Sequence, residues 1–136
     1  MDIMEPVSVA RAFVDAVNAG SVVRLAALMT EDHVFIDSDG AEYGGKSRMA
    51  PGWGEYLAMV PDYRIMVRET FAAGGTVMMA GEAEGTFVQD GLLKPENHWR
   101  VSAAWRAVVR DGKVAVWQLY VNPEPMANIL KRIRET

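Results

Sequence analysis

The stretch AAWRAVVRDGKVAVWQLYVN, residues 103–122, decides the fold. Apolar and polar side chains alternate on both sides of Asp111-Gly112, a pattern typical of two antiparallel strands joined by a two-residue hairpin. We therefore predict strands at 98–110 and 113–121. The outer parity of this hairpin carries apolar and basic side chains together: Val108, Val114, Val116, Tyr120, Arg100, Arg106 and Arg110.

The segment before this hairpin is also strand-like. We predict strands at 63–72 and 76–88, separated by Ala73-Gly74-Gly75, and a loop at 89–97 that leads into the long strand. Four consecutive strands with short connections form an antiparallel meander. In the strand at 76–88 we assign the even-numbered residues to the inner face, unless a bulge reverses the alternation.

The first half of the chain has mainly helical periodicity. Apolar stripes and capping residues predict helices at 6–20, 21–29 and 46–59, with one short strand at 31–37 between the last two. A final short helix follows Asn122, with Met126, Ile129, Leu130 and Ile133 on one stripe. Helices first and a meander afterwards indicate an α+β fold in one domain, 1–136.

Composition excludes several classes of function. The net charge is −4 with no long basic block, so we expect no nucleic-acid partner. No apolar run approaches the ~20 residues of a membrane span, and the acidic start is unlike a signal peptide, so we expect a cytoplasmic protein that does not bind membranes. With no cysteine and two histidines, we expect no metal site and no organic cofactor.

Three stretches carry a resemblance to a known family: RAFVDAVNAG (11–20), EDHVFIDSDG followed by YGGKSRM (31–40 and 43–49), and the hairpin stretch above. In this order and spacing, the chain resembles the SnoaL-like branch of the nuclear-transport-factor-2-like superfamily, the group that includes ketosteroid isomerase. The resemblance implies a strongly curved, mostly antiparallel sheet whose three N-terminal helices enclose an apolar cavity. Isomerases, epoxide hydrolases, polyketide cyclases and binding subunits share this fold, so the fold does not define the function.

The resemblance transfers to single residues only in part. Asp37, at the end of the first strand, falls on the position of the general base in ketosteroid isomerase. The two donors that stabilise the enolate in that enzyme fall on Phe13 and Ala103, which cannot donate a side-chain hydrogen bond. Because oxyanion donors often contribute the largest catalytic effect, we reject ketosteroid isomerase as the activity.

The epoxide hydrolase branch transfers no better. Its Asp–Arg–Asp relay would fall on Glu82 and Glu84 in one strand and on Trp117 and Leu119 in another. The arginine and one acid of the relay are therefore absent. We do not assign that activity to the chain.

The candidate site combines the resemblance with strand alternation. The candidate catalytic residues are Asp37, Glu82 and Glu84, and the candidate pocket walls are Phe13, His33, Phe35, Trp53, Tyr56, Met78, Trp99, Trp105, Trp117 and Leu119. Each acid has an alternative: Asp37 as a turn residue bonded to backbone amides, and the glutamates as solvated residues on the outer face. His33 and His98 are either proton shuttles or ordinary core and surface residues.

Two functions remain open. The first is cofactor-free acid/base catalysis on a small, mostly apolar molecule, of isomerase, hydrolase or polyketide-cyclase type. The second is a module that binds a small molecule or another protein without turnover. We also expect a homodimer through the outer face of the sheet, because so many apolar groups on an open face are seldom left uncovered.

Overall fold

The computed structural model describes residues 4–136 and contains one mixed sheet with helices on one side of it. In chain order the elements are α1 (Met4–Asn18), α2 (Val22–Ala27), β1 (Met29–Ile36), β2 (Glu42–Gly44), α3 (Lys46–Met59), β3 (Arg64–Ala73), β4 (Thr76–Thr86), the short 3-10 helix η1 (Pro95–Asn97), β5 (His98–Arg110), β6 (Lys113–Val121) and α4 (Glu124–Arg134).

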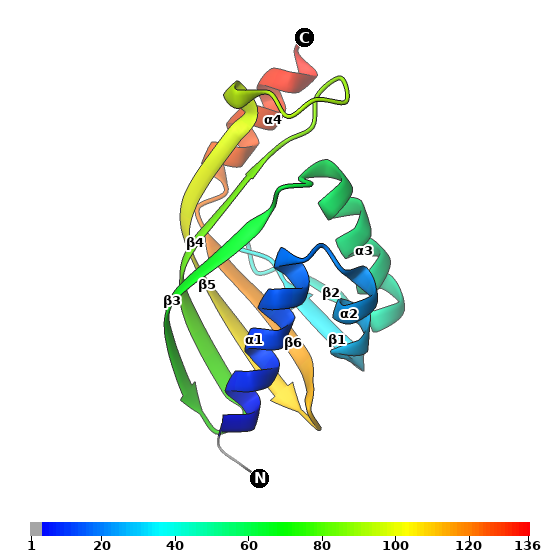
Figure 1. The fold of residues 1–136 in the computed structure, drawn as a ribbon, viewed down its shortest axis with the longest axis vertical. Helices are drawn as coiled ribbons and strands as arrows, with labels where there is room; N and C mark the ends of the chain where they lie inside the picture. Colours follow the sequence, from blue (N-terminus) through cyan, green and yellow to red (C-terminus); the bar gives the residue numbers. More distant parts are fainter. Residues whose placement is uncertain (1–3) are drawn as a thin grey trace.

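The sheet is strongly curved and almost entirely antiparallel. Its strand order is β2-β1-β6-β5-β4-β3, and the single parallel pair is β1 with β6. Figure 1 shows α1, α2 and α3 on the same side of the sheet, while α4 lies at the end of the molecule beside the loop that precedes β5. The predicted α+β class and the cone of three N-terminal helices on a curved sheet are confirmed.

The decisive hairpin forms as predicted. Arg110 pairs with Lys113, and the two residues between them have φ of 53° and 72°. Both central residues of a type I′ turn need positive φ, which aspartate tolerates and glycine favours. The predicted capping residue Ser21 also accepts a hydrogen bond from the Arg24 amide at 3.2 Å.

Most element boundaries differ from the prediction by one or two residues, and two of the differences concern β1 and its partner β2. The second helix ends at Ala27 rather than Met29, because fully buried Met29 already belongs to β1 and pairs with Val114 of β6. The short strand β2 was not predicted. It has only three residues, yet it pairs with the end of β1 and places Tyr43 opposite Phe35.

The predicted inner face of β4 is wrong. Up to Gly85 the buried residues of β4 are odd-numbered, with Val77, Met79 and Ala83 at most 3% exposed, and of the even-numbered residues only Thr86 at the end of the strand is buried. Antiparallel partners share a face, and Glu82 and Glu84 pair with Ser102 and Arg100 on the outer face of β5. Met78, Glu82 and Glu84 therefore lie on the outer face, where carboxylates keep contact with water and cations.

One residue of the predicted outer face is also misplaced. Val114 is fully buried, and its amide donates to the Leu28 carbonyl at 2.7 Å. A register shift lies beside it, between Val108 and Val109 of β5. Such an irregularity lets neighbouring residues of β6 depart from strict alternation.

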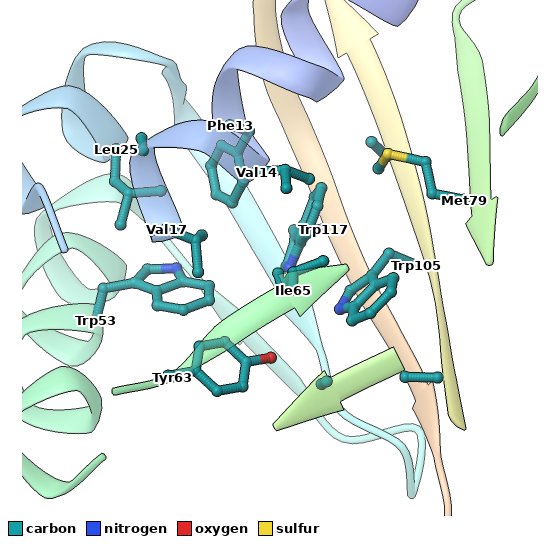
Figure 2. Packing of buried hydrophobic residues seen from close by; sticks show 14 of the residues in the cluster. Phe13, Val14, Val17, Leu25, Trp53, Tyr63, Ile65, Met79, Trp105 and Trp117 are labelled. Carbon is teal, nitrogen blue, oxygen red and sulfur yellow. The ribbon is translucent and has the colours of Figure 1, made fainter. Parts of the chain in front are cut away.

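An aromatic cluster fills the space between α1, α3 and the sheet, as Figure 2 shows. The Phe13 ring on α1 lies 4.5 Å from Trp117 on β6 and 6.2 Å from Trp53 on α3, measured between ring centroids. These distances are typical of favourable aromatic pairs. The cluster fixes the helices against the sheet and supports one wall of the cavity described below.

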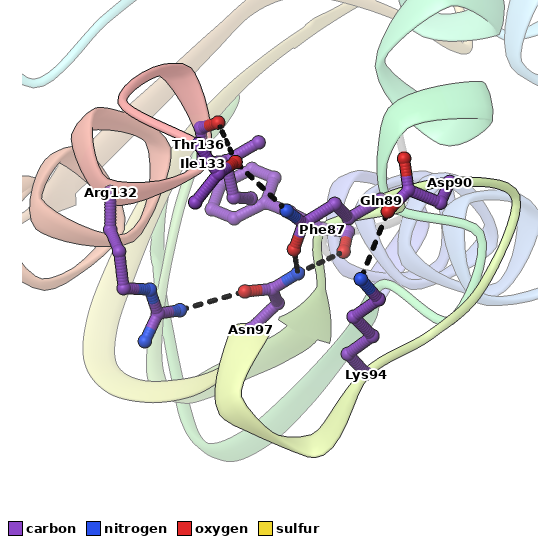
Figure 3. A network of polar contacts seen from close by, with 8 residues as sticks. All are labelled: Phe87, Gln89, Asp90, Lys94, Asn97, Arg132, Ile133 and Thr136. Atoms are coloured by element: carbon purple, nitrogen blue, oxygen red, sulfur yellow. Dashed lines mark hydrogen bonds and ion pairs between the residues drawn. The ribbon is translucent and has the colours of Figure 1, made fainter.

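Helix α4 is held to the far end of the sheet by polar contacts as well as by its apolar stripe. Arg132 donates to the Asn97 side chain at 2.7 Å, and Asn97 itself is fully buried (Figure 3). The Gln89 side chain contacts the Thr136 hydroxyl at 3.3 Å. Across residues 4–136, no helix is both long and apolar enough to cross a membrane.

Candidate functional site

A cavity of about 480 Å³ lies between α3 and the β1, β2, β5 and β6 part of the sheet. That volume is within the usual range for sites that bind small molecules. Its lining combines aromatic rings with a few charged side chains: Phe35, Asp37, Tyr43, Arg48, Met49, Pro51, Gly52, Trp53, Glu55, Tyr56, Tyr63, Trp105, Trp117 and Leu119. Half of these fourteen residues are aromatic.

Asp37, the residue after the first strand, is one of the two acids that line this cavity. It follows β1 directly and opens a turn in which the Gly40 amide donates to the Asp37 carbonyl at 2.9 Å. One carboxylate oxygen, Oδ1, accepts from the Ser38 amide at 2.7 Å. Within the described chain the other oxygen has no hydrogen-bond donor and the carboxylate has no ion-pair partner. Asp37 is thus both a turn residue and part of the pocket wall.

Two tyrosines line the same cavity as this carboxylate. Their rings lie 5.2 Å apart in an edge-to-face arrangement, Tyr56 on α3 and Tyr63 just before β3. Burial raises the pKa of Tyr56, and the nearby Asp37 charge raises it further. Burial also raises the pKa of Tyr63, with a smaller contribution from Tyr56. Both phenols therefore stay protonated around neutral pH and remain hydrogen-bond donors.

Charged groups on α3 complete the mouth of the cavity. Arg48 is exposed, and its guanidinium carbon lies 5.0 Å from the centroid of the Tyr43 ring. Glu55, also exposed, lies on the same helix and lines the same opening. With Asp37, the lining carries two carboxylates and one guanidinium, a formal charge of 1 − 2 = −1.

The structure brings most of the candidate pocket residues together. Those that line the cavity are Phe35, Trp53, Tyr56, Trp105, Trp117 and Leu119. Phe13 is fully buried behind this wall, where it packs on Trp117. Trp99 packs on Tyr63 and Phe87 farther along the sheet, and Met78 lies on the outer face. These three candidates do not line the cavity.

The prediction that Glu82 and Glu84 face the cavity is also wrong. Glu82 accepts from Arg100 at 2.7 Å and from Arg68 at 3.0 Å on the outer face. These two arginines hold the pKa of Glu82 below its usual value, with Arg100 contributing most. Glu84 lies 3.4 Å from His98 Nε2, and His98 also contacts the Thr86 hydroxyl. These acids therefore share no cavity with Asp37.

His33 is a core residue and not part of the cavity lining. It is fully buried, stacks beside Phe13, and its Nδ1 lies 2.7 Å from the Val114 carbonyl oxygen. The accepting carbonyl requires the Nδ1–H tautomer. Burial lowers the pKa of His33, so the folded protein contains the neutral ring.

This burial predicts a pH dependence of stability. The unfolded chain protonates His33 below about pH 6.5 while the folded chain does not, so the free energy of unfolding falls as the pH falls. We expect a decrease of about 1 kcal/mol between about pH 7.5 and pH 5.5 in urea unfolding. His33→Phe should flatten this slope, whereas His98→Gln should keep it. An unchanged slope in His33→Phe would contradict this assignment.

Several lining residues were not predicted from the sequence: Tyr43, Arg48, Met49, Pro51, Gly52, Glu55 and Tyr63. A helical signal was present for some of them. Met49 and Gly52 precede Trp53 and Tyr56 by four residues each, so they share one face of α3 with the predicted pocket residues. Tyr43 lies in the three-residue strand β2 and Tyr63 in the short segment before β3, and neither segment is long enough to show a periodicity. Within residues 4–136, no group of three or more His, Asp or Glu side chains is placed to hold a metal ion.

A curved sheet, three covering helices and an internal cavity define the class of cone-shaped α+β proteins that includes the nuclear-transport-factor-2-like and ketosteroid-isomerase-like folds. Within that class, residues 10–117 match the family model of the SnoaL-like domain. The chain belongs to the SnoaL-like domain family. No curated protein sequence is significantly similar to it.

Solved structures share the fold at low sequence identity. A protein of ketosteroid isomerase-like fold from Catenulispora acidiphila, in complex with trimethylamine, is 18% identical with a TM-score of 0.70, covering 82% of this chain and 83% of its own. An epoxide hydrolase of the LEH-like type from M. tuberculosis is 18% identical with a TM-score of 0.76, covering 97% and 93%. A SnoaL-like protein from Shewanella denitrificans is 14% identical with a TM-score of 0.78, covering 93% and 97%.

Proposed function

We propose that this protein binds a small, mostly apolar molecule in the aromatic cavity and that Asp37 acts on it as a general base. The observation that carries the proposal is a carboxylate in the wall of a cavity that is half aromatic, with one oxygen that has no hydrogen-bond donor among residues 4–136. A general base must reach the proton that it removes, and a free carboxylate oxygen satisfies that requirement. The reaction would be cofactor-free, of isomerase, hydrolase or polyketide-cyclase type.

The two tyrosines supply hydrogen-bond donors that are absent at the positions expected from ketosteroid isomerase. Phe13 and Ala103 cannot donate to a developing oxyanion, but Tyr56 and Tyr63 place neutral phenols in the same cavity as Asp37. In our proposal at least one of them donates to the substrate oxygen while Asp37 removes a proton. Donors that are already oriented before the reaction are effective because they need no reorganisation.

The names of proteins with similar structures are consistent with a function that involves a small molecule. One neighbour is an epoxide hydrolase and another is in complex with trimethylamine. The epoxide hydrolase relay itself does not transfer, because Glu82 and Glu84 pair with arginine and histidine on the outer face. The alternative is a binding module without turnover, which the missing donors at Phe13 and Ala103 favour.

A matched pair of variants on β6 tests the cavity as the binding site. Leu119 lines the cavity, whereas its neighbour Tyr120 points to the outer face and is 44% exposed. Leu119→Trp should place a larger ring in the space where the apolar group of the ligand would pack, and it should reduce the affinity for meta-tert-butylphenol at least about tenfold in calorimetric titrations. Tyr120→Trp should bind like the wild type. Equal affinity in both variants would reject the proposal.

We also propose a homodimer through the outer face of the sheet. Val108 and Val116 pair across β5 and β6 there, beside Arg106 and exposed Tyr120. Sedimentation at micromolar concentration should show a dimer for the wild type. Val108→Glu should shift it to a monomer, because it places a charge in an apolar contact. The matched control is Val23→Glu on α2, where the native valine is 82% exposed and the dimer should persist. A monomeric wild type would refute the proposal.

A further inference from the structure

The cavity is lined by aromatic rings rather than by aliphatic side chains. Aliphatic groups are sufficient to hold an apolar ligand, yet Leu119 and Met49 are the only leucine and methionine in a lining that is half aromatic. Aromatic rings differ from aliphatic groups because their faces carry partial negative charge. A cavity built from such faces attracts a positively charged group as well as an apolar one.

The fixed charges of the lining have the same sign as the ring faces. Asp37 and Glu55 outweigh Arg48, and within residues 4–136 no lysine or arginine pairs with either acid. Arg48 itself illustrates the interaction, because its guanidinium already lies over the face of Tyr43 at the mouth. The neutral phenol of Tyr56 lies near Asp37, and the Tyr63 ring lies 5.2 Å from that of Tyr56 in the same cavity.

We propose that the ligand of this cavity is a small, mostly apolar molecule that carries a cationic amine, tertiary or quaternary. The charged nitrogen would lie between Asp37 and the faces of Tyr56 and Trp105, and the apolar remainder would pack on Trp117 and Leu119. This inference rests on the proposed function, since it concerns the same cavity. It adds the charge of the ligand, which the family and the fold leave open.

Two probes of one shape, together with an anionic companion, separate the charge of the ligand from its size. Meta-hydroxyphenyltrimethylammonium and meta-tert-butylphenol differ only in a charged nitrogen that replaces a carbon, and meta-hydroxybenzoate is an anionic companion. In calorimetric titrations at low salt we expect the cation to bind at least about tenfold more tightly than the neutral probe, as a desolvated cation–π contact implies. The benzoate should bind most weakly.

Two variants test whether Asp37 causes the preference for the cationic probe. Asp37→Asn keeps the acceptor for the Ser38 amide and removes the charge, so it should weaken the cation about tenfold and leave the neutral probe within about twofold. Glu42→Gln removes an equal charge from an exposed residue of β2 that does not line the cavity, and it should change neither affinity. A loss for the cation that is equal in both variants would overturn the role of Asp37.

The outcomes separate this inference from the proposed function. If the neutral probe or the benzoate binds as tightly as the cation, the proposal of a cationic ligand is refuted. If Leu119→Trp also abolishes that binding, the cavity nevertheless remains the binding site. If no probe binds to the wild type, or if Leu119→Trp leaves all affinities unchanged, both the inference and the proposed function are refuted.

Discussion

Gly81→Ala is expected to lower the free energy of unfolding by about 3 kcal/mol, at the upper end of the usual cost of overpacking. A Cβ atom at this position would lie 1.9 Å from the Met66 carbonyl oxygen and 3.1 Å from the Arg68 amide nitrogen. Both atoms are backbone, so no side-chain rotation relieves the clash. The register of β3 against β4 shifts here, between Val67 and Glu69, and the bulged strand presses on Gly81.

Thermal unfolding is the measurement for this prediction. A loss of this size should lower Tm by about 10 °C for a domain of this length. Gly44→Ala is the control, because nothing lies within 4 Å of an added Cβ there. It should stay within about 0.5 kcal/mol of the wild type. If both variants unfold at the same temperature, the bulge does not have the close approach described here.

Asp37→Asn is expected to reduce the turnover of any substrate that the wild type converts by at least about 100-fold, the lower end of general-base contributions. The amide still accepts from the Ser38 backbone, so the turn keeps its shape, but an amide cannot remove a proton. Binding of a neutral ligand should change little. For a neutral substrate the effect should therefore fall on kcat rather than on KM.

Steady-state kinetics with a matched control test this expectation. Glu42→Gln removes the same charge from the strand that pairs with β1, outside the cavity, and should retain wild-type kcat. Tyr56→Phe should also reduce kcat if its hydroxyl donates to the substrate, while leaving Asp37 in place. Unaltered kcat in Asp37→Asn would remove the catalytic part of the proposal and leave a binding module.

The fold was largely predictable because the decisive signals are local. The Asp111-Gly112 turn, the Ser21 cap and the helical stripes each act within a few residues, and the order of elements follows from them. The failure at β4 has a specific cause. Its inward-facing row reads Val77, Met79, Gly81, Ala83 and Gly85, and the two glycines make this row look less apolar than the rest of the inner face.

The register with β5 shows why the even row could not face inward. Trp105 lies opposite Met79 and Ala103 lies opposite Gly81, so the correctly predicted inner face of β5 requires the odd residues of β4. The sequence of one strand alone does not determine its register with a partner strand. The outward position of the glutamates is also the lower-energy one, since two arginines there compensate the charge of Glu82 and His98 lies beside Glu84.

The candidate site was predictable where strand alternation places the residue, and not where chain segments approach one another in space. Asp37 and Phe35 follow from β1, and Trp105 and Trp117 from the central hairpin. Tyr63 and Arg48 enter the cavity only because α3 packs across the sheet. No pattern in the neighbouring residues predicts that contact.

The indole N–H signals in a proton–nitrogen NMR spectrum test the central claim most directly. The chain has four tryptophans, of which Trp53, Trp105 and Trp117 line the cavity and Trp99 does not. Titration with meta-hydroxyphenyltrimethylammonium should shift the signals of the three lining indoles and leave that of Trp99 nearly unchanged. A shift of Trp99 alone, or no shift of Trp105 and Trp117 at saturating ligand, would contradict the assignment of this cavity as the binding site.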